Sequence, residues 1–197
     1  MTRFASLFFA SALSFSQAHA GDEITYKGMP LGSSFHEFSM LFEDHECSGN
    51  ACIFVLENCI FGKRSRRLPA APNQSTDCRK RNSFGGTYPE AIISSFRDGK
   101  LVSISFTTWL TSFEILTAAA TEKLGPPSKI VESTLQTRSG ATFQNLTHYW
   151  EKASFVLKVD KYGTKIDRGS ALLISRDELD RSENEKATRK RDGAKDF

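Results

Sequence analysis

Two runs, Ala91-Ile-Ile-Ser-Ser-Phe-Arg97 and Leu101-Val-Ser-Ile-Ser-Phe-Thr107, flank the tripeptide Asp98-Gly99-Lys100. An Asp-Gly pair between two β-prone runs is a strong signal for an antiparallel hairpin with a two-residue turn. The second run alternates strictly, with Val102, Ile104 and Phe106 on one face and Ser103, Ser105 and Thr107 on the other. Such alternation is typical of a sheet with one buried face and one hydrated face. The sequence therefore predicts an antiparallel sheet around this hairpin.

Outward from the hairpin, further runs have the length and composition of strands. They are Ile24–Tyr26, Cys52–Leu56, Lys129–Thr137, Thr142–Glu151, Phe155–Lys161 and Ser170–Ser175. Ser139-Gly140 and Lys152-Ala-Ser154 are the turns expected between the later runs. These runs extend the predicted sheet on both sides of the hairpin.

Two short amphipathic helices are expected, each with a capping box at its start. The first follows Ser34, with Glu37 three residues on, and its apolar stripe is Phe35, Phe38, Leu41 and Phe42. The second runs from about Ser112 to Leu124, with Thr111 and Glu114 as its capping box, and its stripe is Phe113, Leu116, Ala120 and Leu124. Stripes with this spacing predict that each helix buries one face in the core.

The predicted fold class is α+β: an antiparallel sheet with two short helices packed on one face and a disulfide-stapled first half. A capped helix followed by strands occurs twice in succession, which suggests two helix–strand repeats. We expect a single domain over residues 21–175, with a long basic loop at 62–86. The charged residues 176–197 are expected to form a frayed helix or a disordered, flexible tail, because they contain almost no apolar side chains.

The first twenty residues have the pattern of an export signal. Arg3 supplies a positive start, residues 4–15 are largely apolar, and Ala18-His19-Ala20 is the small-x-small motif of a cleavage site before Gly21. No cysteine lies near this site, so a lipoprotein is not expected. The prediction is a periplasmic protein with no integral membrane segment after processing.

The four cysteines, Cys47, Cys52, Cys59 and Cys78, all lie in the predicted exported part. An even number of cysteines in an exported chain indicates two disulfides, and three pairings are possible. The Ser-Gly-Asn sequence between Cys47 and Cys52 is typical of a turn. We therefore favour Cys47–Cys52 with Cys59–Cys78.

Charge is segregated along the chain although the formal net charge is only +3. Residues 21–57 hold seven acids and one base, whereas residues 58–89 hold seven bases and one acid; among the bases are Lys63, Arg64, Arg66 and Arg67. The basic block either binds an anionic envelope surface or an acidic protein, or is neutralised by the acidic block. Nucleic acid is not an expected partner, because no stacking aromatics interleave the bases.

The sequence shows no catalytic signature and implies no cofactor. After processing only His36, His45 and His148 remain, and no Gly-x-Ser-x-Gly motif precedes a helix. Glu43-Asp44-His45-Glu46 is a dense group of potential metal ligands, but it lacks the His-Glu-x-x-His spacing, and no metal site is predicted. A cell-wall hydrolase or metal-dependent enzyme is kept as the alternative from another class, since paired carboxylates can be remote in sequence.

Several short motifs resemble the β-lactamase-inhibitor-like fold, which includes the small SmpA/OmlA-type accessory lipoproteins. They are Gly32-Ser33-Ser34 before one helix, Leu124-Gly125-Pro126-Pro127 after the other, and Tyr149-Trp150 on a later strand. Residues 24–175 are also similar to small uncharacterised periplasmic proteins of proteobacteria, through Tyr162-Gly163-Thr164-Lys165 near the end. The chain lacks the lipobox cysteine of the accessory lipoproteins.

The resemblance implies a sheet whose uncovered face grips another protein. Trp109, Tyr149 and Trp150 are the expected anchors on that face, because Trp and Tyr are favoured at interfaces. The expected function is non-enzymatic binding of another periplasmic or envelope protein, as an inhibitor or immunity protein. An accessory role in outer-membrane or envelope assembly is the alternative among binding proteins.

Overall fold

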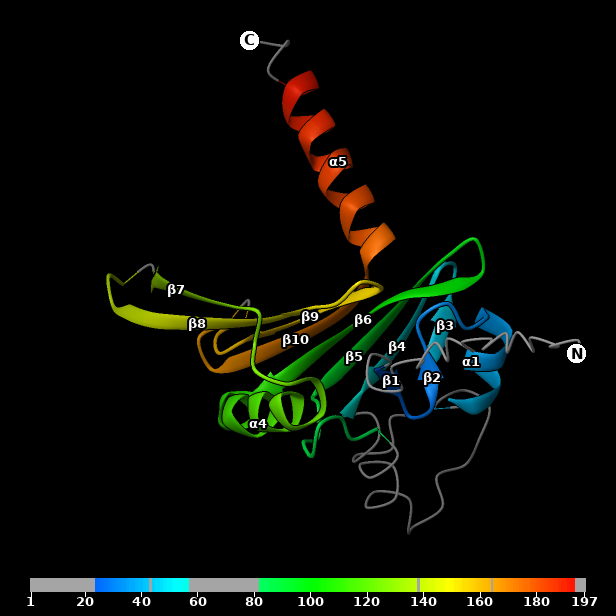
Figure 1. Ribbon diagram of the computed structural model, residues 1–197, viewed down its shortest axis with the longest axis horizontal. Coiled ribbons are helices and arrows are strands. Elements are labelled where there is room, and N and C mark those ends of the chain that lie inside the picture. Colours follow the sequence, from blue (N-terminus) through cyan, green and yellow to red (C-terminus); the bar gives the residue numbers. More distant parts are fainter. Residues whose placement is uncertain (1–23, 43, 57–81, 138, 164, 194–197) are drawn as a thin grey trace, which may run out of the picture.

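The computed structural model describes residues 24–42, 44–56, 82–137, 139–163 and 165–193. Figure 1 shows its arrangement. The strands are β1 (Thr25–Tyr26), β2 (Met29–Pro30), β3 (Glu46–Ser48), β4 (Ala51–Val55), β5 (Ala91–Arg97), β6 (Lys100–Trp109), β7 (Lys129–Gln136), β8 (Thr142–Glu151), β9 (Phe155–Asp160) and β10 (Arg168–Ser175). The helices are α1 (Phe35–Leu41), the short 3-10 helix η1 (Leu110–Ser112), α4 (Phe113–Leu124) and α5 (Arg176–Gly193).

Eight strands form one antiparallel sheet in the order β3-β4-β5-β6-β10-β9-β8-β7. Each half of this sheet is a helix followed by a four-strand meander: α1 with β3–β6 (the N-terminal unit, residues 35–109) and α4 with β7–β10 (the C-terminal unit, residues 113–175). The last strands of the two units, β6 and β10, pair at the centre. This order confirms the α+β class, the antiparallel sheet and the two helix–strand repeats.

The hairpin predicted from Asp98-Gly99 joins β5 to β6. Both turn residues have positive φ, 51° at Asp98 and 73° at Gly99, as a two-residue turn between twisted strands requires. One detail differs from the prediction. Ser95 pairs with Ser103 and Phe96 with Leu101, so Val102 has no opposite residue and forms a β-bulge. The bulge turns Leu101 into the core in place of Val102.

Helix α1 starts as predicted. The Ser34 side chain accepts a hydrogen bond from the Glu37 backbone N–H, and the Glu37 carboxylate accepts one from the Ser34 N–H. Phe38 and Phe42 are buried, but Leu41 is 64% exposed and does not belong to the core. Leu41 lies about 100° around the helix axis from Phe42, and this places it at the margin of the buried side.

Helix α4 buries the predicted stripe of Phe113, Leu116, Ala120 and Leu124. Its predicted capping box is wrong. The 3-10 turn η1 occupies residues 110–112, so the N-cap is Ser112 instead of Thr111, and no side chain caps the helix. The backbone N–H of Gly125 closes the other end on the Thr121 carbonyl oxygen.

The core lies between the sheet and the two helices α1 and α4. Around α1 it consists largely of stacked and edge-to-face rings, including those of Tyr26, Phe38 and Phe42. Part of the predicted 62–86 loop contributes to it: Phe84 stacks on Phe106 at 4.1 Å between ring centroids, and Asn82 is buried. Asn82 accepts a hydrogen bond from the Tyr26 hydroxyl and donates one to Asp44, which joins the loop to the strand β1.

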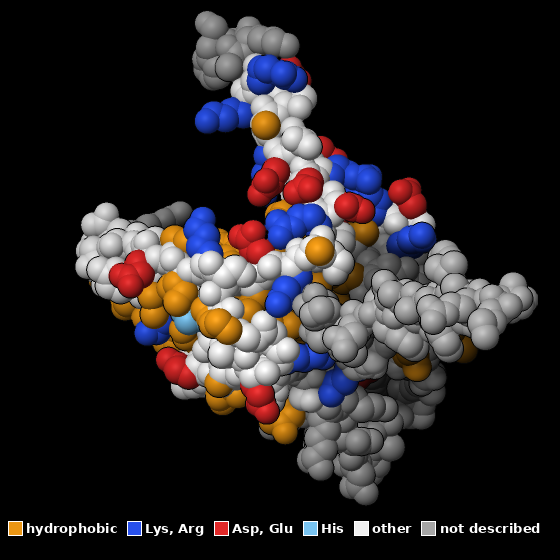
Figure 2. Space-filling model, viewed as in Figure 1, with side chains coloured by type: hydrophobic (Ala, Val, Ile, Leu, Met, Phe, Trp, Pro, Cys, Tyr) orange, Lys and Arg blue, Asp and Glu red, His pale blue; other side chains and the backbone are white. Residues whose placement is uncertain are grey.

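Residues 176–193 form the continuous helix α5, and a helix is one of the two forms expected for this charged segment. The helix buries none of its residues. It leaves the sheet on the side opposite α4 (Figure 1) and carries charged side chains of both signs along its length (Figure 2). No helix within the described ranges combines the length and apolarity needed to span a membrane.

Candidate functional site

The face of the sheet opposite α1 and α4, here called the open face, is a surface to which strands of both units contribute. Strand register places one row of side chains across all eight strands. In sheet order the row is Glu46, Ile53, Ile93, Ser105, Leu172, Lys158, Tyr149 and Lys129. The aliphatic members of the row are Ile53, Ile93 and Leu172 on β4, β5 and β10, and charged or aromatic residues occupy its two ends.

The aliphatic residues of this row on the open face, here called the apolar patch (Ile53, Ile93 and Leu172), belong mainly to the N-terminal unit. Ile53 of β4 and Ile93 of β5 lie directly opposite each other and are 44% and 42% exposed. Ser105 of β6 and the half-buried Leu172 of β10 continue the row. Ser105 lies between Ile93 and Leu172 in this row, so the exposed apolar surface is concentrated on β4 and β5.

Trp109 ends β6 on the same face and is 44% exposed. The Arg168 guanidinium lies over its ring, 4.1 Å from the ring centroid. Arg168 is itself held by the carboxylates of Glu90 and Asp167, and these acceptors raise its pKa. The ion pairs therefore fix a planar, charged and aromatic surface at one corner of the open face.

A polar cluster occupies the open face of the C-terminal unit. The Asp160 carboxylate accepts hydrogen bonds from Thr147 at 2.7 Å and Ser170 at 3.1 Å, and lies 2.9 Å from the Lys158 ammonium. These three partners come from β8, β10 and β9, so the cluster joins three neighbouring strands. Both carboxylate oxygens are already bonded within the chain, which gives the cluster a structural role in fixing the shape of this surface.

The base of α5 borders the open face and is held by both units. Arg97 of β5 makes a bidentate pair with Glu178, with both N–O distances 2.7 Å, and this lowers the pKa of the Glu178 carboxyl. Arg176 lies 3.5 Å from Glu151 of β8. A cleft of about 660 Å³ lies beside this base, between Leu31, the β5–β6 turn and Phe155.

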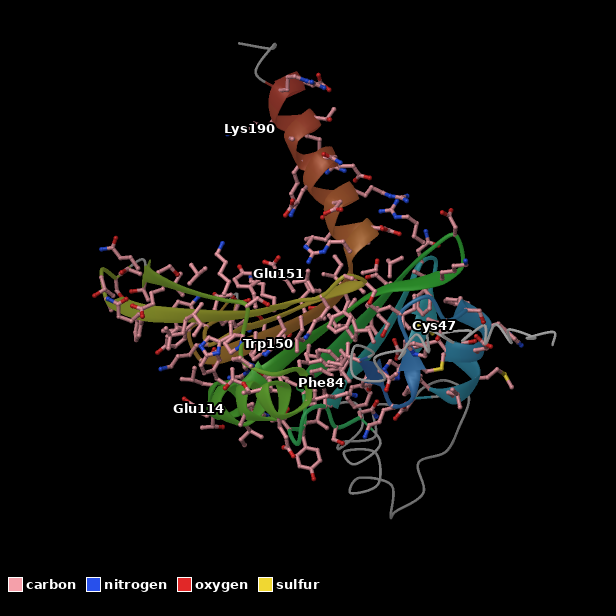
Figure 3. All side chains as sticks on the ribbon, viewed as in Figure 1. Cys47, Phe84, Glu114, Trp150, Glu151 and Lys190 are labelled. Carbon is pink, nitrogen blue, oxygen red and sulfur yellow. A yellow bond between two sulfur atoms is a disulfide. The ribbon has the colours of Figure 1, made fainter. Side chains whose placement is uncertain are left out.

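Two of the three predicted aromatic anchors lie on the open face and one does not. Trp109 and Tyr149 share this face, about 20 Å apart by strand spacing, and Lys129 lies 5.8 Å above the Tyr149 ring. Trp150 is fully buried, and its indole N–H donates to the Gly125 carbonyl oxygen at 2.9 Å. Consecutive residues on a strand face opposite sides, so Tyr149 and Trp150 cannot both be anchors; Figure 3 shows Trp150 on the α4 side.

The Cys47–Cys52 disulfide is present, and the two residues lie opposite each other in the β3–β4 hairpin. The other predicted cysteines, Cys59 and Cys78, lie outside the described residues. So do the basic residues Lys63, Arg64, Arg66 and Arg67 and the predicted cleavage site at Ala18, Ala20 and Gly21.

The two partly or fully buried histidines lie on the helix-covered side of the sheet. The His45 ring packs against Phe38, Phe42 and Phe54, with its Nδ1 3.2 Å from Asp44. His148 packs against Phe113, and burial lowers its pKa. Neither ring reaches the hydroxyl groups of the open face. Within the described residues no three His, Cys, Asp or Glu side chains are grouped closely enough to hold a metal ion.

Sequence reasoning did not find the Asp160 cluster or the Arg168–Trp109 contact. The alternation in Phe155-Val-Leu-Lys-Val-Asp160 puts Lys158 and Asp160 on the same face, which was a usable signal. Their partners Thr147 and Ser170 come from neighbouring strands, and only the strand register identifies them.

Comparison of the chain with models of protein families, with curated proteins and with solved structures finds no match.

Proposed function

We propose that this chain is a non-enzymatic protein-binding domain of the periplasm that holds another envelope protein on its open face. Within this class, inhibition of an envelope-acting enzyme, as an inhibitor or immunity protein, is the role we favour. The sequence resemblance to inhibitor-like proteins and the arrangement of the open face point in the same direction.

The observation that carries this proposal is the exposed apolar patch of the open face. Ile53 and Ile93 form a cross-strand pair on the second and third strands from the β3 edge, and each keeps more than two fifths of its surface in contact with solvent. Exposed apolar groups that adjoin one another and are rimmed by polar residues mark interaction surfaces. Trp109 with Arg168, and Tyr149 with Lys129, supply at the rim the residue types that dominate binding energy at protein interfaces.

The proposed location rests on two features. The N-terminal sequence has the pattern of an export signal, and the Cys47–Cys52 disulfide is compatible with an oxidising compartment outside the cytoplasm.

The test is capture of a partner from periplasmic extract with the open face altered. Ile93→Lys places a charge in the apolar patch, whereas Ile115→Lys makes the same change at an exposed position on α4, away from the open face. We expect one stoichiometric partner that binds wild-type protein and Ile115→Lys equally and binds Ile93→Lys at least about tenfold more weakly. If the wild type, Ile115→Lys and Ile93→Lys bind the partner equally, the open face is not the binding surface. If the purified protein hydrolyses peptidoglycan, the non-enzymatic proposal is wrong and the chain is a cell-wall hydrolase.

A further inference from the structure

Strand β7 forms one edge of the sheet and differs from the strand at the other edge. It has eight residues and pairs with β8 in unbroken register from Lys129–Tyr149 to Gln136–Thr142. The opposite edge strand, β3, has three residues and is joined to β4 by a disulfide. Long, regular and uncovered edges present unpaired backbone groups to other strands, and proteins normally shorten or distort them. β7 is neither short nor bulged.

The hydrogen-bonding direction of each β7 residue follows from the turn at its end. The Thr137 N–H donates to the Ala141 carbonyl oxygen, so odd-numbered residues of β7 bond toward β8. The N–H and C=O groups of Ile130, Glu132, Thr134 and Gln136 therefore point away from the sheet. These four residues are all exposed, and Ile130 is 53% exposed.

We propose that this edge binds the β7 strand of a second copy of the chain, antiparallel and across a two-fold axis perpendicular to the sheet. Outward-pointing backbone groups specify an extended peptide as the ligand. The choice of a second copy comes from the side chains of β7, which are complementary to themselves in one register.

That register places Ser133 opposite its own copy. Val131 then lies opposite Leu135 of the second copy on the open face, and Glu132 lies opposite Thr134 on the other face, where a hydroxyl can donate to the carboxylate. Ile130 lies opposite Gln136, and the outward backbone groups of all four even-numbered residues meet each other. Each of these contacts occurs twice because the axis is two-fold.

The two neighbouring symmetric registers are less favourable. The register centred on Glu132 would place two glutamates directly opposite each other, which destabilises a strand pair. The register centred on Thr134 would shorten the overlap of the two strands. An alignment shifted by one residue from any of these symmetric registers would place a residue whose backbone groups point away from the sheet opposite one whose backbone groups point toward β8. The sequence Lys129-Ile-Val-Glu-Ser-Thr-Leu-Gln136 thus selects one alignment.

The pairing would join two eight-stranded sheets into one continuous sheet with both open faces on the same side. A dimer built this way presents two binding faces to one surface, so a partner that is itself repeated would be held more tightly than a single copy. The contact is small for a stable dimer, and we therefore expect reversible, concentration-dependent association.

Cysteine cross-linking tests the register. Residues opposite each other at a non-hydrogen-bonded antiparallel position have Cα atoms about 4.5 Å apart, within the range of a disulfide. Ser133→Cys in the full exported protein should give a covalent dimer under mild oxidation, and Glu132→Cys should not. Dimer formation by Glu132→Cys but not by Ser133→Cys would overturn the proposed register.

Charge substitution tests the association itself, measured by sedimentation equilibrium over a range of concentrations. Val131→Lys with Leu135→Lys places lysines opposite each other twice and should weaken dimerisation about tenfold or more. Val131→Glu with Leu135→Lys places opposite charges in the same positions and should restore it. Ile115→Lys is the control for added charge and should dimerise as the wild type does. A wild-type protein that stays monomeric at millimolar concentration, with no cross-link from Ser133→Cys, would exclude the dimer.

Discussion

The N-terminal and C-terminal units share one topology and differ in almost everything that stabilises it. In the N-terminal unit a seven-residue helix covers strands that are joined by a disulfide hairpin. In the C-terminal unit a twelve-residue helix covers longer strands joined by short turns. The comparison shows that one helix–strand arrangement can be stabilised in two different ways, because the side chains that fill the core can vary while the pattern of buried and exposed positions is kept.

The make-up of the core under each helix follows from the length of that helix. Helix α1 buries only Phe38, and Phe42 at its C-cap is buried beside it, so large rings from other segments fill the remaining space. Helix α4 brings four side chains and packs over Leu157, Val159 and the single indole of Trp150. A short helix thus needs larger side chains, and help from loops, to cover the same width of sheet.

Truncation of a buried aromatic ring should cause the largest loss of stability, and it should do so in either unit. Phe38→Ala and Trp150→Ala each remove a fully buried side chain, and we expect each to lower the free energy of unfolding by about 3–5 kcal/mol. Chemical denaturation monitored by circular dichroism measures both. If the units unfold independently, each variant will show two transitions instead of one, and the central β6–β10 pairing will not have coupled them.

Removal of the Cys47–Cys52 disulfide should have the next largest effect and tests what is specific to the N-terminal unit. Only five positions separate the two cysteines, and a loop this short gives about 2 kcal/mol by the chain-entropy argument. The Cys47→Ala, Cys52→Ala double variant should lose this amount in urea denaturation. An unchanged midpoint would mean that the β3–β4 hairpin forms equally well without the bridge.

The two helix starts give a smaller and sharper contrast. Ser34→Ala removes a side chain that caps α1 and should cost about 1 kcal/mol. Thr111→Ala is the matched change at the start of the other helix and should cost almost nothing, because Thr111 makes no cap there. Thermal denaturation of both variants compares them directly. An equal loss at Thr111 would contradict the structure of the α4 N-terminus.

The smallest expected effect is a pH dependence that belongs to the C-terminal unit. Burial lowers the pKa of His148, so between its folded pKa and the ordinary value of 6.5 the unfolded chain binds more protons than the folded chain. The free energy of unfolding should therefore fall as the pH is lowered through this range, and His148→Leu should flatten the dependence. Denaturation at pH 7.5 and pH 5.5 tests this. The same slope in both proteins would assign the dependence to other groups.

Much of the fold followed from local patterns. The Asp98-Gly99 turn, the alternation along β6 and the Ser34–Glu37 box each depend on residues that are neighbours in sequence, and each is present in the structure. Two of the predictions that were wrong, the cap of α4 and the burial of Val102, failed because a neighbouring backbone feature changed the local conformation. Thr111 lies within the 3-10 turn η1 and does not cap α4. Val102 lies at a β-bulge, and Leu101 is buried in its place.

The sequence by itself determined most of the alternation, the position of the Asp98-Gly99 turn and the start of α1, because these depend on backbone conformation within a few residues. Only the tertiary structure decided that Tyr149 faces solvent while Trp150 is buried, that Arg168 lies over Trp109, and that β7 stands at an edge. These outcomes depend on strand order and register, which are set when distant segments exclude water from a common core. The open face exists because α1 and α4 both pack on the other side of the sheet.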